Sequence, residues 1–149
     1  MKIILQRVRH AQVEVEGNII GKINQGLLLL VGIDQDDSEA DADWLVQKTL
    51  NLRVFSDQDG KMNLSVRDIG GELLCISQFT LLADYKKGNR PSYIRAARPE
   101  KAIPLFDYFK KELAKSGLKT DSGQFGADMK VSLLNDGPVT IAMDSKTKS

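Results

Sequence analysis

The segment GLLLLVGI, residues 26–33, carries an unbroken apolar run between two glycines. A strand with one wet face alternates polar and apolar residues, whereas an unbroken run predicts a strand covered on both faces. The next segment, residues 34–52, predicts a helix, because Asp37 or Ser38 can cap its N-terminus and acidic residues complement the dipole there. Its apolar stripe consists of Ala42, Leu45, Val46, Thr49 and Leu50. A covered strand followed by a helix that packs on the sheet indicates an α/β fold.

Strand patterns lie on both sides of this segment. Each consists of aliphatic residues bounded by turn residues. The predicted strands are residues 3–8, 13–15, 19–23, 72–77, 130–134 and 139–143, with two more on either side of the DQDG turn within residues 52–66. The Gly17-Asn18 turn predicts that the early strands form a hairpin. In the same way, the sequence NDGP at residues 135–138 would ordinarily be the turn between the last two strands.

A second helix is expected from Pro99 to Gly117, since proline suits a first helical turn and glycine suits the residue after a helix. Its inward side chains are Ala102, Leu105, Phe106, Phe109 and Leu113. The complete pattern predicts an α/β domain of mixed, largely antiparallel sheets curled toward a barrel, with two main helices outside. We expect a single domain over residues 1–149, with residues 145–149 frayed.

The composition limits the class of protein. The chain has 149 residues, 42% of them hydrophobic and 28% charged, and no apolar stretch approaches the roughly 18 residues that a membrane span needs. We therefore expect a soluble protein. The single cysteine, Cys75, excludes an internal disulfide and a cysteine-based metal cluster, which favours a reducing, cytoplasmic location. The net charge of +1 gives no global attraction to nucleic acid, so such binding needs a local cluster of cations.

Most motifs of enzyme chemistry are missing from the sequence. The single histidine, His10, has no carboxylate or nucleophile near it in a recognisable pattern, and we interpret it as a surface or strand-end residue. No glycine-rich phosphate loop and no metal-ligand spacing is present. We therefore expect chemistry without a cofactor or a metal.

Two stretches suggest a site. The cluster Ser77, Gln78, Phe79 and Thr80 follows the buried strand 72–77, where polar residues either cap loose backbone groups or form a site on a rigid scaffold. A basic run comes next, with Tyr85 and Tyr93 interleaved, and this mixture suits phosphates and exposed bases. Its polar and cationic residues are Lys86, Lys87, Asn89, Arg90, Arg95 and Arg98. A solvated loop remains the alternative for this run.

The segment NDGP has a second interpretation beside the plain turn. The peptide bond before a proline adopts the cis form for only about 0.5–1 kcal/mol, and glycine before it removes a side chain that would crowd a ligand. A cis Gly137-Pro138 bond would present two carbonyl oxygens as a rigid wall without a side chain.

Five motifs together resemble the D-aminoacyl-tRNA deacylase family of the bacterial and eukaryotic type. They are KMNLSV at 61–66, SQFTL at 77–81, KGNRPSY at 87–93, FGADM at 125–129 and NDGPVT at 135–140. The resemblance extends along essentially the whole chain, and the lysine-rich C-terminal tail lies outside it. Tyr93 stands where phenylalanine is common, and it keeps an aromatic ring.

The resemblance implies hydrolysis of the ester that joins a D-amino acid to the terminal adenosine of tRNA, with glycyl-tRNA as a second substrate. It implies a homodimer in which Gly137-Pro138, in cis, reaches into the partner's active site and rejects L-amino acids. The residues carried over are catalytic Ser77, Gln78, Phe79 and Thr80, pocket residues Phe125, Met129, Asn135 and Thr140, and phosphate contacts Lys86, Lys87 and Arg90.

Two questions stay open at this point. Thr80 could be a covalent nucleophile, but the sequence offers it no obvious base; the hypothesis we favour is attack by water assisted by the 2′-hydroxyl of the terminal ribose. The protein could instead be a non-catalytic RNA-binding module or a hydrolase of small ligands. Neither alternative uses the polar cluster, the basic loop and the Gly-Pro segment together.

Overall fold

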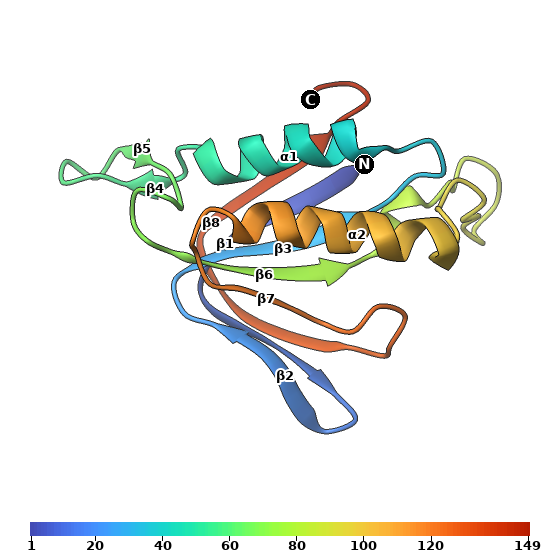
Figure 1. The fold of residues 1–149 in the computed structure, drawn as a ribbon, viewed down its shortest axis with the longest axis horizontal. Helices are drawn as coiled ribbons and strands as arrows, with labels where there is room; N and C mark the ends of the chain where they lie inside the picture. The colour runs from blue at the N-terminus through green and yellow to red at the C-terminus, as the bar shows by residue number, and fades with distance from the viewer.

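The computed structural model describes residues 1–149 as one layered unit, with two helices over a curled sheet (Figure 1). The strands are β1 (Lys2–Val15), β2 (Asn18–Ile23), β3 (Gly26–Gly32), β4 (Phe55–Ser56), β5 (Met62–Leu64), β6 (Glu72–Ser77), β7 (Thr120–Ser122) and β8 (Lys130–Asp144). The helices are α1 (Glu39–Asn51), the short 3-10 helix η1 (Phe79–Leu82) and α2 (Pro99–Ala114). The predicted α/β class with two main outer helices is confirmed.

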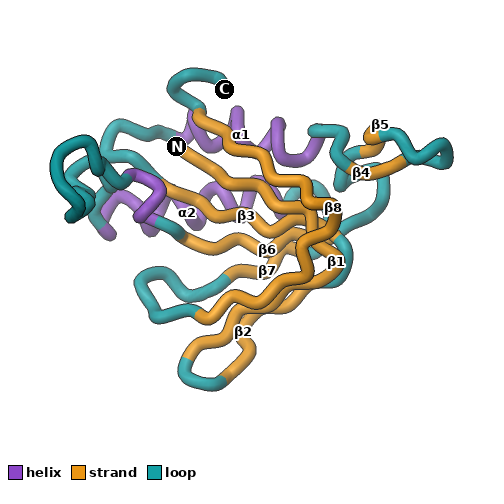
Figure 2. Tube along the Cα trace, turned by 180° about the vertical axis from the view of Figure 1, so that it is seen from behind, coloured by secondary structure: helices purple, strands orange, loops and turns teal.

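Six strands form one mixed sheet, in which β2, β1, β3, β6 and β7 follow one another and β8 pairs with the free edge of β1. The long strand β1 is antiparallel to β2, β3 and β8, whereas β6 runs parallel to both β3 and β7. Because β1 pairs with three strands along its length, the sheet curls nearly into a barrel, as the view from behind shows (Figure 2). Strand β3 lies in its centre, as its apolar run predicts.

Two apolar clusters stabilise this arrangement. The larger one lies between the sheet and the helices, and the buried faces of α1 and α2 contain all the residues that the sequence predicts, together with Asp41 of α1. The smaller one fills the inside of the curl, with Val8, Ala11, Val13, Ile23, Leu28, Leu74 and Ile76. Burial of each of its valine, leucine and isoleucine side chains contributes about 1.5–3 kcal/mol. The ends of β3 and β6 are therefore held from both faces.

Two predicted breaks do not exist. Residues 3–15 form one strand, β1, and His10 lies exposed within it, opposite Leu134. The two last strands are also one, β8, so the NDGP segment is not a hairpin turn. It is a bulge, because Gln6 pairs with Thr140 and Val8 with Asn135, so that four residues of β8 lie opposite Arg7 alone.

The first residue of the C-terminal tail packs against the domain, whereas residues 146–149 are exposed. Ser145 is buried, accepts a hydrogen bond from the Met1 ammonium group at 2.8 Å and donates one to Asp41 at 2.7 Å. Strand β7 was not predicted, because it is only three residues long and polar. No helix is long and apolar enough to cross a membrane.

Candidate active site

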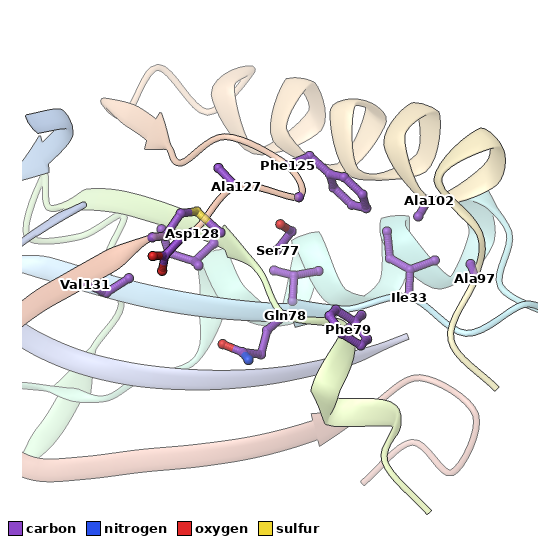
Figure 3. A pocket seen from close by; sticks show the side chains of 14 residues that line it. Ile33, Ser77, Gln78, Phe79, Ala97, Ala102, Phe125, Ala127, Asp128 and Val131 are labelled. Atoms are coloured by element: carbon purple, nitrogen blue, oxygen red, sulfur yellow. The ribbon is translucent and has the colours of Figure 1, made fainter. Parts of the chain in front are cut away.

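A cavity of about 270 Å³ opens where β3 and β6 end, beside α2 and the loop between β7 and β8. Its lining residues are Val31, Ile33, Ile76, Ser77, Gln78, Phe79, Ala97, Ala102, Phe125, Gly126, Ala127, Asp128, Met129 and Val131. Figure 3 shows Phe125 and Ala102 across the cavity from Gln78 and Phe79. A largely apolar pocket with a few polar groups is the usual form of a small-ligand site.

The polar groups of the cavity come from the exit of β6. The backbone N–H of Gln78 donates to the carbonyl of Val31 at 2.7 Å, which extends the pairing with β3 one residue beyond the strand. The chain then turns into η1, where the N–H groups of Phe79 and Thr80 occupy the first helical positions. Helical geometry leaves such N–H groups without an acceptor inside the helix. They are free to bind a developing negative charge.

The close approach of η1 to β3 depends on Gly32. A Cβ atom at this position would lie 2.7 Å from Cδ2 of Leu82, 2.9 Å from Cβ of Leu81 and 3.0 Å from the carbonyl oxygen of Gln78. Any larger residue would push η1 away from the sheet. Gly32 therefore sets the depth at which the polar cluster lies.

Thr80 has a neutral partner. Its hydroxyl oxygen accepts a hydrogen bond from the side-chain amide of Gln78 at 2.5 Å. An amide N–H that donates cannot also take the proton of the hydroxyl, so Gln78 is not the base that a threonine nucleophile needs. This contact holds Thr80 in position.

The ionisable groups near the cavity do not form a nucleophile-base pair. Cys75 lies in β6, and burial raises the pKa of its thiol to about 12, so it stays protonated at neutral pH. Asp128 is the only ionisable residue of the lining, and its side chain is 82% exposed and 3.1 Å from Lys130. His10 lies outside the lining. The arrangement can bind, orient and stabilise charge, and it leaves the attacking group to come from water or substrate.

The Gly137-Pro138 segment lies on the exposed side of β8, and its peptide bond is cis, as the resemblance implies. Arg7 holds this bulge: its Nε donates to the carbonyl of Asp136 at 2.9 Å, and its Nη1 donates to the carbonyl of Val54 at 2.6 Å. The Arg7 side chain is only 12% exposed. The bulge is thus tied, through a largely buried cation, to the backbone carbonyl of Val54.

The predicted phosphate contacts lie in an exposed loop beside η1, closed by a bridge between Asp84 and Ser92. Lys86, Lys87 and Arg90 form no ion pair within the chain, so their charges are available to a partner. Arg95 differs, because it binds Asp34 at 2.6 Å and Asp36 at 2.8 Å. Its charge is neutralised within the chain, contrary to its expected place in the basic run.

Comparison with known proteins agrees with the motifs. The model of the family described as D-Tyr-tRNA(Tyr) deacylase matches residues 4–144. The chain belongs to the D-Tyr-tRNA(Tyr) deacylase family. It is 56% identical to a D-aminoacyl-tRNA deacylase of Bacteroides thetaiotaomicron over 149 residues and 57% identical to one of Akkermansia muciniphila over 150 residues, and each alignment covers 99% of both chains.

Solved structures extend the family likeness to the fold. A structure described as c-Myc DNA Unwinding Element Binding Protein is 42% identical, covers 97% of this chain and 98% of its own, and superposes with a TM-score of 0.90. A probable eukaryotic D-amino acid tRNA deacylase superposes with a TM-score of 0.83 over 95% of this chain and 97% of its own. Its sequence identity is 14%, so that comparison concerns the fold alone.

The structure brings together part of the predicted family site. Ser77, Gln78, Phe79, Phe125 and Met129 line the cavity, with Thr80 bonded to Gln78 at its edge. The exposed residues Asn135, Gly137, Pro138 and Thr140 do not line the cavity of the same chain, and their roles stay predictions. Sequence reasoning missed Arg7, which shares its early strand with Arg9, so no sequence pattern distinguishes it.

Proposed function

We propose that this protein hydrolyses D-aminoacyl-tRNA to a free D-amino acid and tRNA, with two copies of the chain completing each active site. The observation that carries the enzymatic part is the full-length likeness of 56–57% to D-aminoacyl-tRNA deacylases. By that likeness the chain is a D-aminoacyl-tRNA deacylase, an ester hydrolase. Because its substrate is a tRNA, we place its action in the cytoplasm.

The chemistry that we propose uses the polar exit of β6. Water attacks the ester carbonyl, the bond to the ribose oxygen breaks, and a proton passes to that oxygen as the carboxylate leaves. The N–H groups of Phe79 and Thr80 would stabilise the oxyanion, and each such donor contributes roughly 3–4 kcal/mol. The neighbouring ribose 2′-hydroxyl would orient the water and relay its proton, accepting it while passing its own proton to the departing ester oxygen, since the only hydrogen bond to the Thr80 hydroxyl comes from an amide. The protein supplies position and electrostatics.

The chiral selection that we propose uses Gly137 and Pro138 of the second copy. These residues lie outside the cavity of their own chain and exposed on β8, where a partner could receive them. A backbone wall that excludes the side chain of an L-amino acid leaves the D direction open, so it rejects one enantiomer without restricting the side chain. Glycine has no side chain to exclude, so glycyl-tRNA would also be hydrolysed.

Matched D- and L-tyrosyl-tRNA test this function. The purified protein is incubated with each, and ester loss is followed against an enzyme-free control. We expect rapid release of D-tyrosine and release of L-tyrosine at the rate of the control. Equal release of both would support the hydrolase activity but contradict the proposed rejection of L-amino acids by Gly137-Pro138.

The alternative is a non-catalytic nucleic-acid-binding module. It is suggested by the description of the 42% identical structure as a DNA unwinding element binding protein. Under it, the protein would bind charged tRNA without accelerating ester loss. Competition by duplex DNA, measured in the same samples, would show whether the surface prefers DNA.

A further inference from the structure

Two aromatic rings stand exposed beside the mouth of the cavity. The residue Phe79 is 55% exposed and Tyr93 is 37% exposed, although aromatic residues of this size are ordinarily well covered. Their ring centroids are 5.0 Å apart at an interplanar angle of 73°, an edge-to-face pair. We call Phe79 and Tyr93 the aromatic pair.

The aromatic pair lies between the cavity and the basic loop. Phe79 belongs to the cavity lining, whereas Tyr93 lies outside it. The chain returns from Tyr93 to the cavity within four residues, because Ala97 lines it and donates its N–H to the carbonyl of Ile33 at 2.9 Å. On the other side, Tyr93 follows directly on the loop that carries Lys86, Lys87 and Arg90. A path from the cavity across the rings therefore ends at three free positive charges.

We propose that the aromatic pair is a stacking platform for the nucleobase that precedes the terminal adenosine of the RNA 3′ strand. This inference rests on the proposed function and adds to it how the unpaired end of the tRNA is held. A volume of about 270 Å³ is at the small end for a ligand pocket, so the cavity leaves no space for a second nucleotide beside the esterified end group. The next base must then lie outside the mouth, where the rings are exposed.

The positive charges beside the aromatic pair favour single-stranded nucleic acid, and not a second protein surface, as its binding partner. Exposed aromatic rings next to a row of unpaired cations are the usual combination in single-strand binding sites, where bases stack on rings and phosphates contact Lys and Arg. The free charges of Lys86, Lys87 and Arg90 beside the rings would be costly to cover with an ordinary protein surface.

Three substrates of increasing length test the platform: D-tyrosine esterified to adenosine, to cytidylyl-adenosine and to tRNA. The Tyr93→Ala variant should lower kcat/KM on the dinucleotide and tRNA by about 5-fold to 150-fold, the range that loss of one base-aromatic stack gives, and leave the adenosine ester unchanged. Tyr93→Phe should restore wild-type values on all three. Ile94→Ala is the matched control, because Ile94 is the next residue and is 78% exposed but has no ring.

Other outcomes would overturn the proposal. An equal loss on all three substrates would mean that Tyr93 only shapes the cavity, and no loss on any would mean that the rings bind no base. A Tyr93→Ala variant with an altered oligomeric mass would make the aromatic pair a contact between protein copies. If the wild type hydrolyses none of the esters, the proposed function fails. The platform is then tested by binding of an oligonucleotide that ends in CCA and carries no amino acid. Tyr93→Ala should weaken its binding and leave the binding of adenosine unchanged, and equal affinities of wild type and variant for the oligonucleotide would overturn the platform.

Discussion

Gln78 is the residue that most restricts which catalytic mechanism this site can use. It donates to the hydroxyl oxygen of Thr80, and a group that donates there cannot serve as the base of a nucleophilic threonine. Cys75 is two residues before Ser77, and burial raises the pKa of its thiol to about 12, so it cannot replace Thr80 in that role. Positioning of substrate and water is the function left to these side chains.

Replacing Thr80 with alanine tests this role. The backbone N–H that we assign to the oxyanion remains, so kcat for D-tyrosyl-tRNA should fall by no more than about 10-fold, with an unchanged circular dichroism spectrum. A covalent nucleophile would lose about 10⁴-fold or more on the same substitution. Single-turnover assays with rapid quenching measure the difference directly.

Gly137 is the second residue with a specific geometric demand. Its φ is +139°, and a Cβ atom there would lie 2.8 Å from the backbone nitrogen of Val139 and 3.0 Å from Nη2 of Arg7. The Gly137→Ala variant should therefore displace the bulge and lower the rate on D-tyrosyl-tRNA by about 10- to 100-fold, since misplacement of about 1 Å costs that much.

Gly60→Ala is the matched control for Gly137→Ala. Gly60 also has a positive φ, +76°, but open space surrounds its missing side chain, and it lies in the turn between β4 and β5. Gly60→Ala should lose roughly 1–2 kcal/mol of unfolding free energy from its positive φ alone, and Gly137→Ala should lose at least as much, measured in urea. Equal activity losses in the two would show that backbone strain, and not the bulge, lowers the rate.

Among the elements, those with strong local signals were predicted closely. Helix α1 has a cap and an apolar period of 3.6 residues, and β3 and β6 have unbroken apolar runs, so local sequence alone determines them. Strand β8 was predicted as two strands because Pro138 ordinarily breaks a ladder. It can lie within β8 because that strand pairs only with β1 and leaves its other edge open.

The site was predicted in part for the same reason. Ser77 and Gln78 follow a strand that sequence defines, and Phe125 and Met129 come from a motif. Ile33, Ala97 and Ala102 are ordinary apolar residues, and only the fold brings them to one cavity. The contact of Arg7 with Asp136 joins residues 129 positions apart, which no local pattern contains.

The N-terminus of α1 gives a prediction about acid stability. Burial acts to raise the pKa of Asp41, but hydrogen bonds from Ser145, the N–H of Ser38 and Lys146 outweigh it, and the net pKa lies well below the ordinary value of 3.8. A lowered pKa stabilises the fold above the ordinary value and loses this contribution as pH falls through the lower one. Asp41→Asn should therefore cost about 1–3 kcal/mol of unfolding free energy at pH 7 and progressively less from pH 5 to pH 2.

Urea unfolding of the two proteins at several pH values measures this difference. Asp59→Asn is the control, since it alters an exposed carboxyl group of the β4–β5 turn. A cost that does not change with pH would mean that the hydrogen bonds of Asp41, and not its charge, stabilise α1.

For the whole molecule, the distribution of free charge predicts how tRNA binds. The net charge is only +1, but Lys86, Lys87 and Arg90 are unpaired and gathered in one loop. The affinity for tRNA should therefore fall steeply with salt and nearly equally for different tRNA sequences. Lys87→Gln should reduce the slope of log affinity against log salt by about 1, measured by filter binding. A slope unaffected by this change would remove the loop from the phosphate path.

The separation of the cavity from the Gly137-Pro138 bulge is the main feature at this scale. Each lies exposed on a different part of the same chain, so the proposed site is complete only when a second copy contributes its bulge. In a symmetric dimer this arrangement produces two identical composite sites.

Subunit complementation tests this central claim most directly. The Gly137→Ala variant, with an intact cavity, is mixed with a Gln78→Ala variant, which has an intact bulge, under conditions that exchange subunits. If the bulge acts across the dimer, random pairing restores one wild-type site in each mixed dimer, and the rate on D-tyrosyl-tRNA should rise to about a quarter of the wild-type rate. A mixture no more active than the mean of its two parents would contradict the composite site.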